Sequence, residues 1–230
     1  MKGIAIIVLV LVSFHGMAQQ VRDHNEFYNR YMTHRVQHGL VQTEDLVEGS
    51  PHENSDFVAG VVVTKDANRY ENIPLRYNIY ADEIEFRARD GNVYFLHEPA
   101  LVDHVIIAGD KYIHAVYASG NRTLYGFFKV KAEGEALLLL RQNMHIRQAE
   151  KPQPYKEAEP ARFVRTQDEY FVWNPPAVVQ RVSNRREMLA VFYDSRSEMN
   201  DFARKNRIRY RQLDDMILLV SHYNSLLRDH

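Results

Sequence analysis

The chain of 230 residues contains no cysteine. This absence excludes disulfide bonds, thiolate metal sites, cysteine nucleophiles and the acylated N-terminal cysteine of a lipoprotein. The ten glycines are scattered singly, and neither Gly-x-x-x-x-Gly-Lys nor Gly-x-Gly-x-x-Gly is present to bind a phosphate. Gly-x-Ser-x-Gly and Ser-x-x-Lys, the patterns of serine nucleophiles, are also missing. No motif in the sequence specifies a reaction.

The chain also lacks an excess of charge of either sign. It contains 29 Lys and Arg residues against 30 Asp and Glu residues. Because no strong positive field would gather a polyanion, we expect no nucleic-acid partner. Long apolar runs are missing beyond the first twenty residues, and we expect no transmembrane segment in the mature chain.

The first 18 residues have the pattern of a secretory signal peptide. Lys2 carries the only charge, an apolar run follows from Ile4 to Val12, and small residues end the segment at Ala18. The run is shorter than the stretch of about 20 residues that spans a bilayer. We therefore predict cleavage after Ala18 and an exported protein that is periplasmic, associated with the outer membrane, or secreted.

The next part of the chain predicts strands. Before the strands, residues 21–40 hold apolar residues at helical spacing and predict a short amphipathic helix, and residues 41–55 predict a polar lead-in loop. Within residues 56–148, apolar and alternating stretches are separated by turn pairs such as Asp90-Gly91 and Gly120-Asn121. This pattern predicts an antiparallel meander of about eight strands, curved into a sandwich or a barrel-like sheet.

The C-terminal part changes from strands to helices. Residues 149–160 are rich in proline and charge and predict an extended connection. Residues 161–183 predict further strands, which gives an α+β fold with about 8–11 strands in all. Residues 184–230 predict a helical cluster that packs on one face or one open end of the sheet. The helices are predicted at about 185–193, 196–206 and 211–227, the first two with capping boxes at Asn184/Glu187 and Ser195/Glu198.

Distinctive short stretches are spread over most of the mature chain: Gly49-Ser50-Pro51, Asp56-Phe57, Pro74–Tyr80, Asp82–Phe86, Pro154-Tyr155, Pro160–Phe163 and Leu218–Leu226. In these residues the chain resembles a group of uncharacterised exported proteins from Bacteroidota-type bacteria. The resemblance implies an address in a Gram-negative cell envelope. The group has no assigned activity, cofactor or catalytic residues, so the resemblance implies nothing further about chemistry.

Two carboxylates form a candidate binding or acid–base pair. Glu83 and Glu85 are two positions apart on a predicted strand, or about 7 Å, and glycosidase carboxylates are about 5–10 Å apart. Their alternation with Ile84 and Phe86 is typical of a solvated sheet face, with Arg76 as a cross-strand partner. We therefore favour a structural role for the pair and keep ligand binding as the alternative.

Histidines are plentiful but form no complete metal motif. His34 and His38 are four apart, as on one helix face, but the Glu of a zinc-peptidase motif is missing between them. His104, preceded by Asp103, and His114 could approach across neighbouring strands, where hydrogen-bonded surface roles also explain them. We predict no metal, no cofactor and no catalytic residue, and we keep His104 and His114 as candidate binding residues.

Aromatic residues are the remaining candidates. Most tyrosines of the predicted strands are expected to fill or border the core. Tyr80 lies on the polar face of its strand, and Trp173 lies beside the break at Pro175-Pro176. If these two side chains are exposed, they are candidate anchors of an interface.

Three function classes follow. The first is a non-catalytic envelope protein that acts as a binding or assembly subunit for an envelope partner, and the absence of a coherent site favours it. The second is a hydrolase of envelope glycan or peptide, with carboxylates and histidines gathered from distant strands. The third is a carrier of a small apolar ligand, if the strands close around a cavity.

Overall fold

The computed structural model describes residues 47–152 and 157–228, together with the backbone of strand β1. The fold is an antiparallel sheet of 11 strands, a separate two-stranded ribbon and three C-terminal α-helices, so the predicted α+β class is confirmed. The strands are β1 (Met32–His34), β2 (Val58–Thr64), β3 (Arg69–Asn78), β4 (Glu83–Arg87), β5 (Val93–Leu96), β6 (Val102–Ile107), β7 (Asp110–Ser119), β8 (Arg122–Ala132), β9 (Leu137–Arg141), β10 (Met144–Arg147), β11 (Arg162–Arg165), β12 (Glu169–Trp173) and β13 (Gln180–Arg181).

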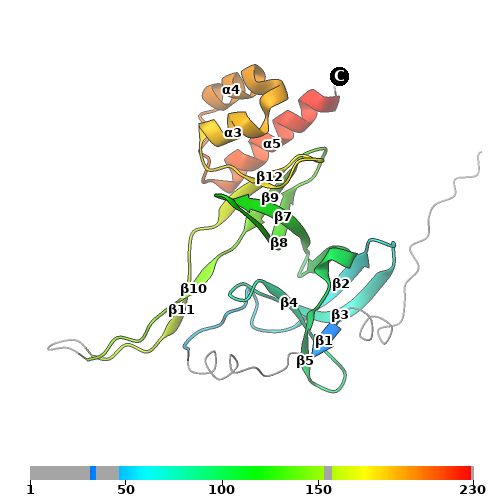
Figure 1. Cartoon of the computed structure of the whole chain (residues 1–230), viewed down its shortest axis with the longest axis vertical. Helices are drawn as coiled ribbons and strands as arrows, with labels where there is room; N and C mark the ends of the chain where they lie inside the picture. Colours follow the sequence, from blue (N-terminus) through cyan, green and yellow to red (C-terminus); the bar gives the residue numbers. More distant parts are fainter. Residues whose placement is uncertain (1–31, 35–46, 153–156, 229–230) are drawn as a thin grey trace, which may run out of the picture.

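The large sheet has the order β1-β5-β4-β3-β2-β6-β7-β8-β9-β12-β13. This order has two ends, so the sheet is open. In Figure 1, β1 to β5 lie in the lower part of the molecule, whereas β7, β8, β9 and β12 lie above them beside the helices. The order departs from a simple meander at β6, which pairs with β2 and not with β5. The apolar run Val61-Val62-Val63 suits this position, since β2 has a neighbouring strand on each side.

Strand β3 is ten residues long, from Arg69 to Asn78. It runs through Pro74, which cannot donate a backbone hydrogen bond. β4 pairs with β3 only from Leu75 to Asn78, so one side of β3 is open at the proline. A proline is tolerated there for the same reason that it is tolerated in edge strands.

The upper part of the sheet curls back on itself. After β12, Val179 forms a parallel bridge with Tyr117 of β7, and its backbone N–H donates to the carbonyl of Val116 at 3.2 Å. The rings of Tyr117, Phe128 and Phe171 meet edge to face inside this curl. Apolar side chains therefore close the space between β7 and β12.

Strands β10 and β11 form a two-stranded ribbon, the arm, that projects from the body (Figure 1). An isolated bridge between Glu150 and Glu159 continues the pairing beyond β10 and β11. The predicted connection over 149–160 is therefore the far end of a long hairpin in its described part. Pro152 and Pro160 in this stretch lack the backbone N–H that a regular ladder needs.

The helices are α3 (Arg185–Val191), α4 (Arg196–Lys205) and α5 (Leu213–Arg228), with a 3-10 turn η2 (Tyr193–Ser195) before α4 and a second, η1 (Pro99–Leu101), before β6. Asn184 caps α3 as predicted, because its side chain accepts from the N–H of Glu187 at 3.0 Å. The capping box predicted at Ser195 and Glu198 is wrong, since Ser195 makes no capping hydrogen bond. The turn η2 precedes α4 directly and already sets the entry of the chain into this helix.

Three apolar clusters stabilise the fold. The first is formed by side chains of the strands from β2 to β8. The second lies between the helices and strands β9 and β12, and the third fills the curl. Strands β7 and β8 serve two of these clusters, because alternate side chains point to opposite faces. Tyr112 and Phe127 belong to the first cluster, and their neighbours Ile113 and Phe128 belong to the third.

The predicted helix over 21–40 is wrong at Met32–His34, which pair as strand β1 with β5. The proposed helix face of His34 and His38 fails for the same reason at His34. The other residues of that segment, and the predicted signal peptide, lie outside the described residues. Of the helices described, none is both long and apolar enough to cross a bilayer.

The surroundings of Gly126 show how the lower and upper parts of the sheet are joined. A Cβ atom there would overlap Arg141 Nη1 and lie 2.7 Å from Asp82 Oδ2. These two side chains form an ion pair of 2.8 Å that links the lower part of the molecule to β9. We expect Gly126→Ala to lower the free energy of unfolding by about 2 kcal/mol in urea denaturation, because the pair must separate.

A double-mutant cycle provides the control. In an Arg141→Met background the same Gly126→Ala change should cost less, because the ion pair is already lost. An equal loss of unfolding free energy in both backgrounds would show that the effect of Gly126→Ala does not come from separating the ion pair.

Candidate functional site

A short segment before β2, residues 47–53 and here called the strap, joins three parts of the fold. Its N–H at Glu48 donates to Ala161 beside the arm at 2.8 Å, and its carbonyl at Pro51 accepts from Ile79 at 2.8 Å. The N–H of Glu53 donates to the carbonyl of Tyr77 at 3.0 Å. The strap thereby adds an irregular strand beside β11 and at the end of β3.

Glu85 is buried under the strap, and its prediction as part of a solvated face is wrong. Its carboxylate accepts from Arg76 Nε at 2.8 Å and from Asn78 Nδ2 at 3.0 Å, and His52 Nε2 lies 3.1 Å away. Burial acts to raise the pKa of Glu85, but the contacts with His52, Asn78 and Arg76 prevail and lower it to about 2. The predicted pairing with Arg76 is confirmed. Glu83 lies on the same strand, opposite Asn78, and is half-buried.

Glu53 forms the second buried network. It accepts from Lys129 Nζ at 2.6 Å and from Gln142 Nε2 at 3.0 Å, and Tyr112 donates its hydroxyl proton to the same carboxylate. Lys129 is 6% exposed and also donates to Asp110 at 2.9 Å. Burial alone would raise the pKa of Glu53, but the hydrogen bonds from Lys129 and Tyr112 lower it. Both networks pair their charges internally, which is typical of structural ion pairs.

The two candidate histidines are not brought together. His104 is adjacent to Val105, whose partner across the ladder is Tyr112, whereas His114 is two positions from Tyr112. Side-chain alternation therefore puts the two histidines on opposite faces of the sheet. His104 Nδ1 lies 2.6 Å from the carboxylate of Asp103.

His114 packs against two aromatic rings, those of Phe127 and Tyr125. Burial lowers the pKa of His114. Among the described residues, no group of three or more His, Asp or Glu side chains is placed to hold a metal ion.

The two aromatic candidates have different surroundings. Tyr80 is 42% exposed, and its ring meets Phe163 of the arm edge to face. Trp173 is half-buried against the third cluster, and its indole N–H donates to the carbonyl of Ala177 at 3.0 Å. Trp173 therefore stabilises the loop 174–178 and is less suited to act as an anchor of an interface.

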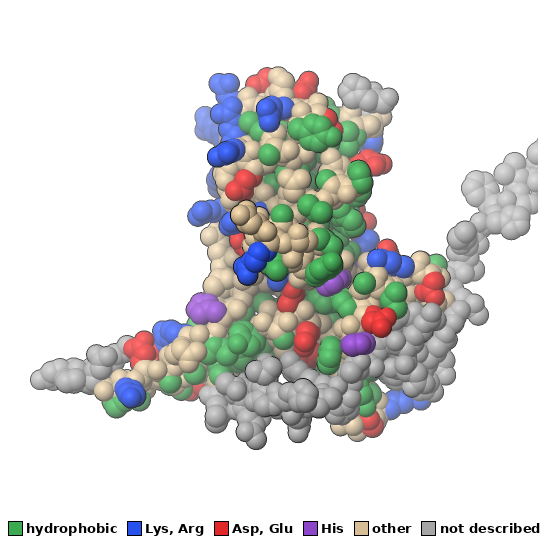
Figure 2. Space-filling view, viewed as in Figure 1, with side chains coloured by type: hydrophobic (Ala, Val, Ile, Leu, Met, Phe, Trp, Pro, Cys, Tyr) green, Lys and Arg blue, Asp and Glu red, His purple; other side chains and the backbone are tan. Residues whose placement is uncertain are grey.

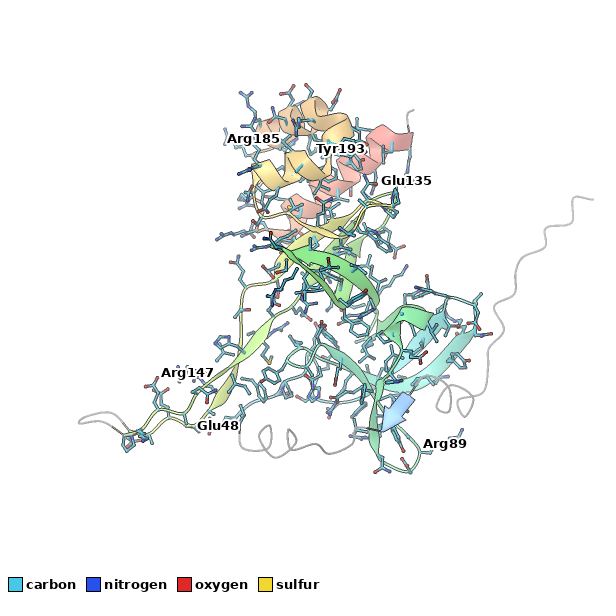
Figure 3. All side chains as sticks on the ribbon, in the orientation of Figure 1. Glu48, Arg89, Glu135, Arg147, Arg185 and Tyr193 are labelled. Carbon is cyan, nitrogen blue, oxygen red and sulfur yellow. The ribbon has the colours of Figure 1, made fainter. Side chains whose placement is uncertain are left out.

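That loop forms one wall of an apolar groove of about 280 Å³, here called the Tyr193 groove. Two large apolar side chains of its lining are exposed, Tyr193 at 74% and Val178 at 49%. Figure 3 labels Tyr193 on the helical part of the molecule. The apolar lining consists of Val172, Pro175, Pro176, Ala177, Val178, Val191 and Tyr193.

The Tyr193 groove is held in shape by one hydroxyl group. Tyr223 of α5 is fully buried, accepts from Asn174 Nδ2 at 2.9 Å and donates to Asp194 at 2.8 Å. Asn174 belongs to one wall and Asp194 to the turn that carries Tyr193. Burial and the bond to Asp194 raise the pKa of Tyr223 to about 12. The two walls are thus fixed to the same core residue.

The sequence analysis missed Tyr193, although a signal was available. Met188, Val191 and Phe192 are spaced as one apolar helix face, and all three are buried. Tyr193 follows this stripe and falls outside it. A large aromatic residue that its own helix cannot bury is a candidate for binding.

No protein-family model, no curated protein and no solved structure matches this chain. The function must therefore be argued from the groove, the buried networks and the distribution of charge.

The low pKa of Glu85 predicts a pH-dependent contribution to stability. A folded-state pKa of about 2 against an ordinary value of 4.5 stabilises the fold fully above pH 4.5, and the stabilisation is lost as the pH falls towards 2. We compare the free energy of unfolding in urea of the wild type with that of Glu85→Gln. The advantage of the wild type should be about 3 kcal/mol larger at pH 6 than at pH 2. If the free energies of unfolding of the two proteins changed with pH in parallel, the low pKa assigned to Glu85 would be contradicted.

The Tyr223 hydroxyl is the second test of the site. We expect Tyr223→Phe to lower the free energy of unfolding by about 1–3 kcal/mol, because Asn174 and Asp194 each lose a partner. The exposed Tyr125 provides the matched control, and Tyr125→Phe should change stability by less than about 0.5 kcal/mol. If Tyr223→Phe is equally mild, the hydroxyl does not hold the groove.

Proposed function

We propose that this protein is a non-catalytic exported subunit that binds a partner protein of the cell envelope through the Tyr193 groove. The observation that carries the proposal is a rigid apolar groove flanked by an exposed tyrosine. The predicted signal peptide supports the envelope address. The occupant is an apolar side chain, with its flanking backbone, from the partner.

The exposure of the groove has an energetic consequence. Apolar surface removed from water contributes about 25 cal/mol for each Å², and Tyr193 and Val178 both leave such surface in water. Tyrosine is among the residues that dominate interface energies when a partner covers them. Two exposed apolar side chains on the rims of one hollow therefore favour a docking surface over scattered surface residues.

The bracing of the groove lowers the cost of binding. Tyr223 fixes both walls, and Trp173 fixes the loop 174–178 by its bond to Ala177. A partner that binds a preformed groove orders few groups of this protein on association. This rigidity supports specific binding by a small area.

The arm supplies a second candidate contact. A two-stranded ribbon alone is only marginally stable in water. In the described part of the arm, the strap, Tyr80 and the contact of Met144 with the first cluster hold its base. The ribbon projects beyond these contacts (Figure 1). An element held in this way gains stability when a partner covers it, which supports an assembly role.

The alternatives have less support in the geometry. For the hydrolase, Glu85 is held in an internal ion-pair network, and His104 and His114 lie on opposite faces. For the carrier, a cavity inside the curled sheet is needed, whereas the side chains of the third cluster fill the curl. The evidence against the hydrolase and against the carrier thus leaves binding of a partner at the surface as the favoured function.

Site-specific crosslinking tests the proposal. A photoreactive phenylalanine derivative at position 193, in the intact envelope, should give one reproducible adduct with an envelope protein. The purified partner should then bind the wild type, and Tyr193→Ala should raise its Kd at least tenfold, since interface tyrosines often contribute about 2 kcal/mol or more.

Position 125 provides the matched control. Tyr125 is 66% exposed on β8 and lines none of the hollows described here. The same crosslinker there should not give the adduct, and Tyr125→Ala should leave the Kd within twofold. Identical adducts at the two positions, or an unchanged Kd for Tyr193→Ala, would overturn the proposal.

A further inference from the structure

The helical part of the molecule carries more positive than negative charge. Residues 181–211 contain nine Lys and Arg residues and four Asp and Glu residues, whereas the whole chain has a formal charge of -1. With α5 included, residues 181–228 contain ten and six. Figure 2 shows blue side chains gathered along one flank of this part. A positive surface is therefore present in a chain that is nearly neutral overall.

Most of the positive side chains of residues 181–211 have no carboxylate partner. All nine are exposed to water. Arg181 pairs with Glu169 at 2.9 Å, and Arg209 pairs with Asp215 at 2.7 Å. In the part of the chain that the structure describes, the other seven form no ion pair. Their charge is therefore available to a partner in solution.

Three of these arginines are held in one row across α3 and α4. Arg196, Asn200 and Arg204 are four residues apart on α4 and therefore share one face of that helix. Arg185 of α3 donates from Nε to the side-chain oxygen of Asn200 at 2.7 Å, which places it beside the same face. Arg196 donates from Nε to the carbonyl of Leu189 on α3 at 3.3 Å. Arg185, Arg196 and Arg204 are here called the arginine row.

The acidic residues of α4 point away from the arginine row. Successive residues of an α-helix are turned by about 100°, so Asp201 is turned by about 100° and Glu198 by about 160° from Asn200. The other two carboxylates of the stretch, those of Glu187 and Asp194, accept hydrogen bonds from neighbouring groups of the protein. The row therefore keeps a local surplus of positive charge.

The arginine row also keeps hydrogen-bond donors for an anion. Arg185 and Arg196 each use Nε for a neutral acceptor, and this bond fixes the position of the guanidinium group. Among the described residues, no acceptor engages their terminal nitrogens or those of Arg204. Pairs of guanidinium N–H groups match two oxygens of a phosphate. Several guanidinium groups in a row therefore suit a surface on which phosphate groups lie side by side.

We propose that the arginine row binds the surface of a membrane that contains anionic phospholipids, with lipid phosphate groups at Arg185, Arg196 and Arg204. An anionic membrane attracts exposed basic residues, and the attraction grows with their number. The row is separate from the Tyr193 groove, and the proposal does not depend on the partner proposed for that groove.

The position of the row in the molecule supports a membrane as the partner. α3 and α4 lie at one end of the molecule, beyond the sheet (Figure 1), so a flat surface can approach them. Figure 3 labels Arg185 at this end. The predicted signal peptide supports the same partner, since export would bring the chain to the membranes of the envelope.

Other anionic partners fit the row less well. The core of a protein interface is rich in aromatic residues and poor in charge, and single-stranded nucleic acid is bound by aromatic side chains on which bases stack. Of the described residues, the six large apolar side chains that are exposed all lie outside α3 and α4. A surface with charge and without apolar anchors favours a layer of lipid headgroups over both.

A small soluble anion is also less suited to the row. Such a ligand is usually enclosed in a cleft or cavity. Two polar hollows of about 390 and 530 Å³ are lined by residues of β12, β13 and the neighbouring loops, and neither is lined by a member of the arginine row. The row thus offers an open surface.

Co-sedimentation with lipid vesicles tests the proposal. The chain is purified after export, so that the predicted signal peptide is absent, and is mixed with phosphatidylcholine vesicles with or without phosphatidylglycerol. We expect at least tenfold tighter binding to the vesicles with phosphatidylglycerol, and an affinity that falls as salt is added. Polyglutamate and oligothymidylate should bind at least tenfold more weakly for the same concentration of negative charge.

Variants then locate the binding. Arg185→Ala, Arg196→Ala and Arg204→Ala in one chain should raise the Kd for the anionic vesicles at least tenfold, with circular dichroism as a check on folding. Arg204→Glu removes no hydrogen bond within the described fold and should alone raise the Kd at least fivefold. This second variant keeps the test valid if the triple variant folds poorly.

A matched control removes the same charge elsewhere. Arg89, Lys151 and Arg162 are exposed, Arg89 in the lower part of the molecule (Figure 3) and the other two in the arm. Changing all three to Ala should leave the Kd within twofold, and so should Arg89→Glu.

Three outcomes would overturn the proposal. The first is that the protein does not bind phosphatidylglycerol vesicles more tightly than phosphatidylcholine vesicles. The second is that polyglutamate or oligothymidylate binds as tightly for the same charge. The third is that the control variants weaken vesicle binding as much as the variants of the arginine row, which would show general attraction to positive charge without a site.

Discussion

The carboxylate of Glu53 is the point at which the separate parts of this molecule are joined. It accepts hydrogen bonds from Tyr112 of β7, Lys129 of β8 and Gln142 at the base of the arm. Glu53 itself belongs to the strap, which is also bonded to β3 and to the residues beside β11. A buried charge such as that of Lys129 is stable only when it is paired and hydrogen-bonded, and Glu53 supplies that partner. The geometry of strap, sheet and arm is thus set by the need to satisfy one side chain.

Two hollows of different chemistry border the return of the chain after β12. The loop 174–178 and strand β13 leave the curled sheet and lead into the helices. Residues 174–178 line the Tyr193 groove, which is apolar, and residues 181–183 line a polar hollow of about 390 Å³. The same short connection therefore contributes to two chemically different surfaces, one apolar and one polar.

The local signals of the sequence predicted most of the elements. Turn pairs such as Asp90-Gly91 marked the hairpins, and the apolar spacing of the last segment marked α5, because these signals depend on neighbours in the chain. The pairing of Arg76 with Glu85 followed from adjacent strands in the same way. The pairing of β6 with β2 could not be predicted in this way, since it joins two strands that are far apart in the chain.

The candidate sites were harder to predict, for a physical reason. Glu85 has the pattern of a surface residue, but His52, 33 positions earlier in the chain, covers it. Burial by a distant segment leaves no trace in local alternation. The positive surplus of residues 181–211 was visible in the sequence, but a charge count over the whole chain averages it away. Counting by segment would have revealed it.

The division of β7 and β8 between two clusters has a consequence for how the molecule comes apart. Tyr112 and Phe127 stabilise the lower part, while Ile113 and Phe128, the next residues along each strand, stabilise the upper part. If either cluster melts, it frees the backbone on which the other is built. Partial unfolding at this seam should therefore be rare, and amide protons along β7 and β8 should exchange only when the whole chain opens. We therefore expect the two architectural halves to unfold as one cooperative thermodynamic unit.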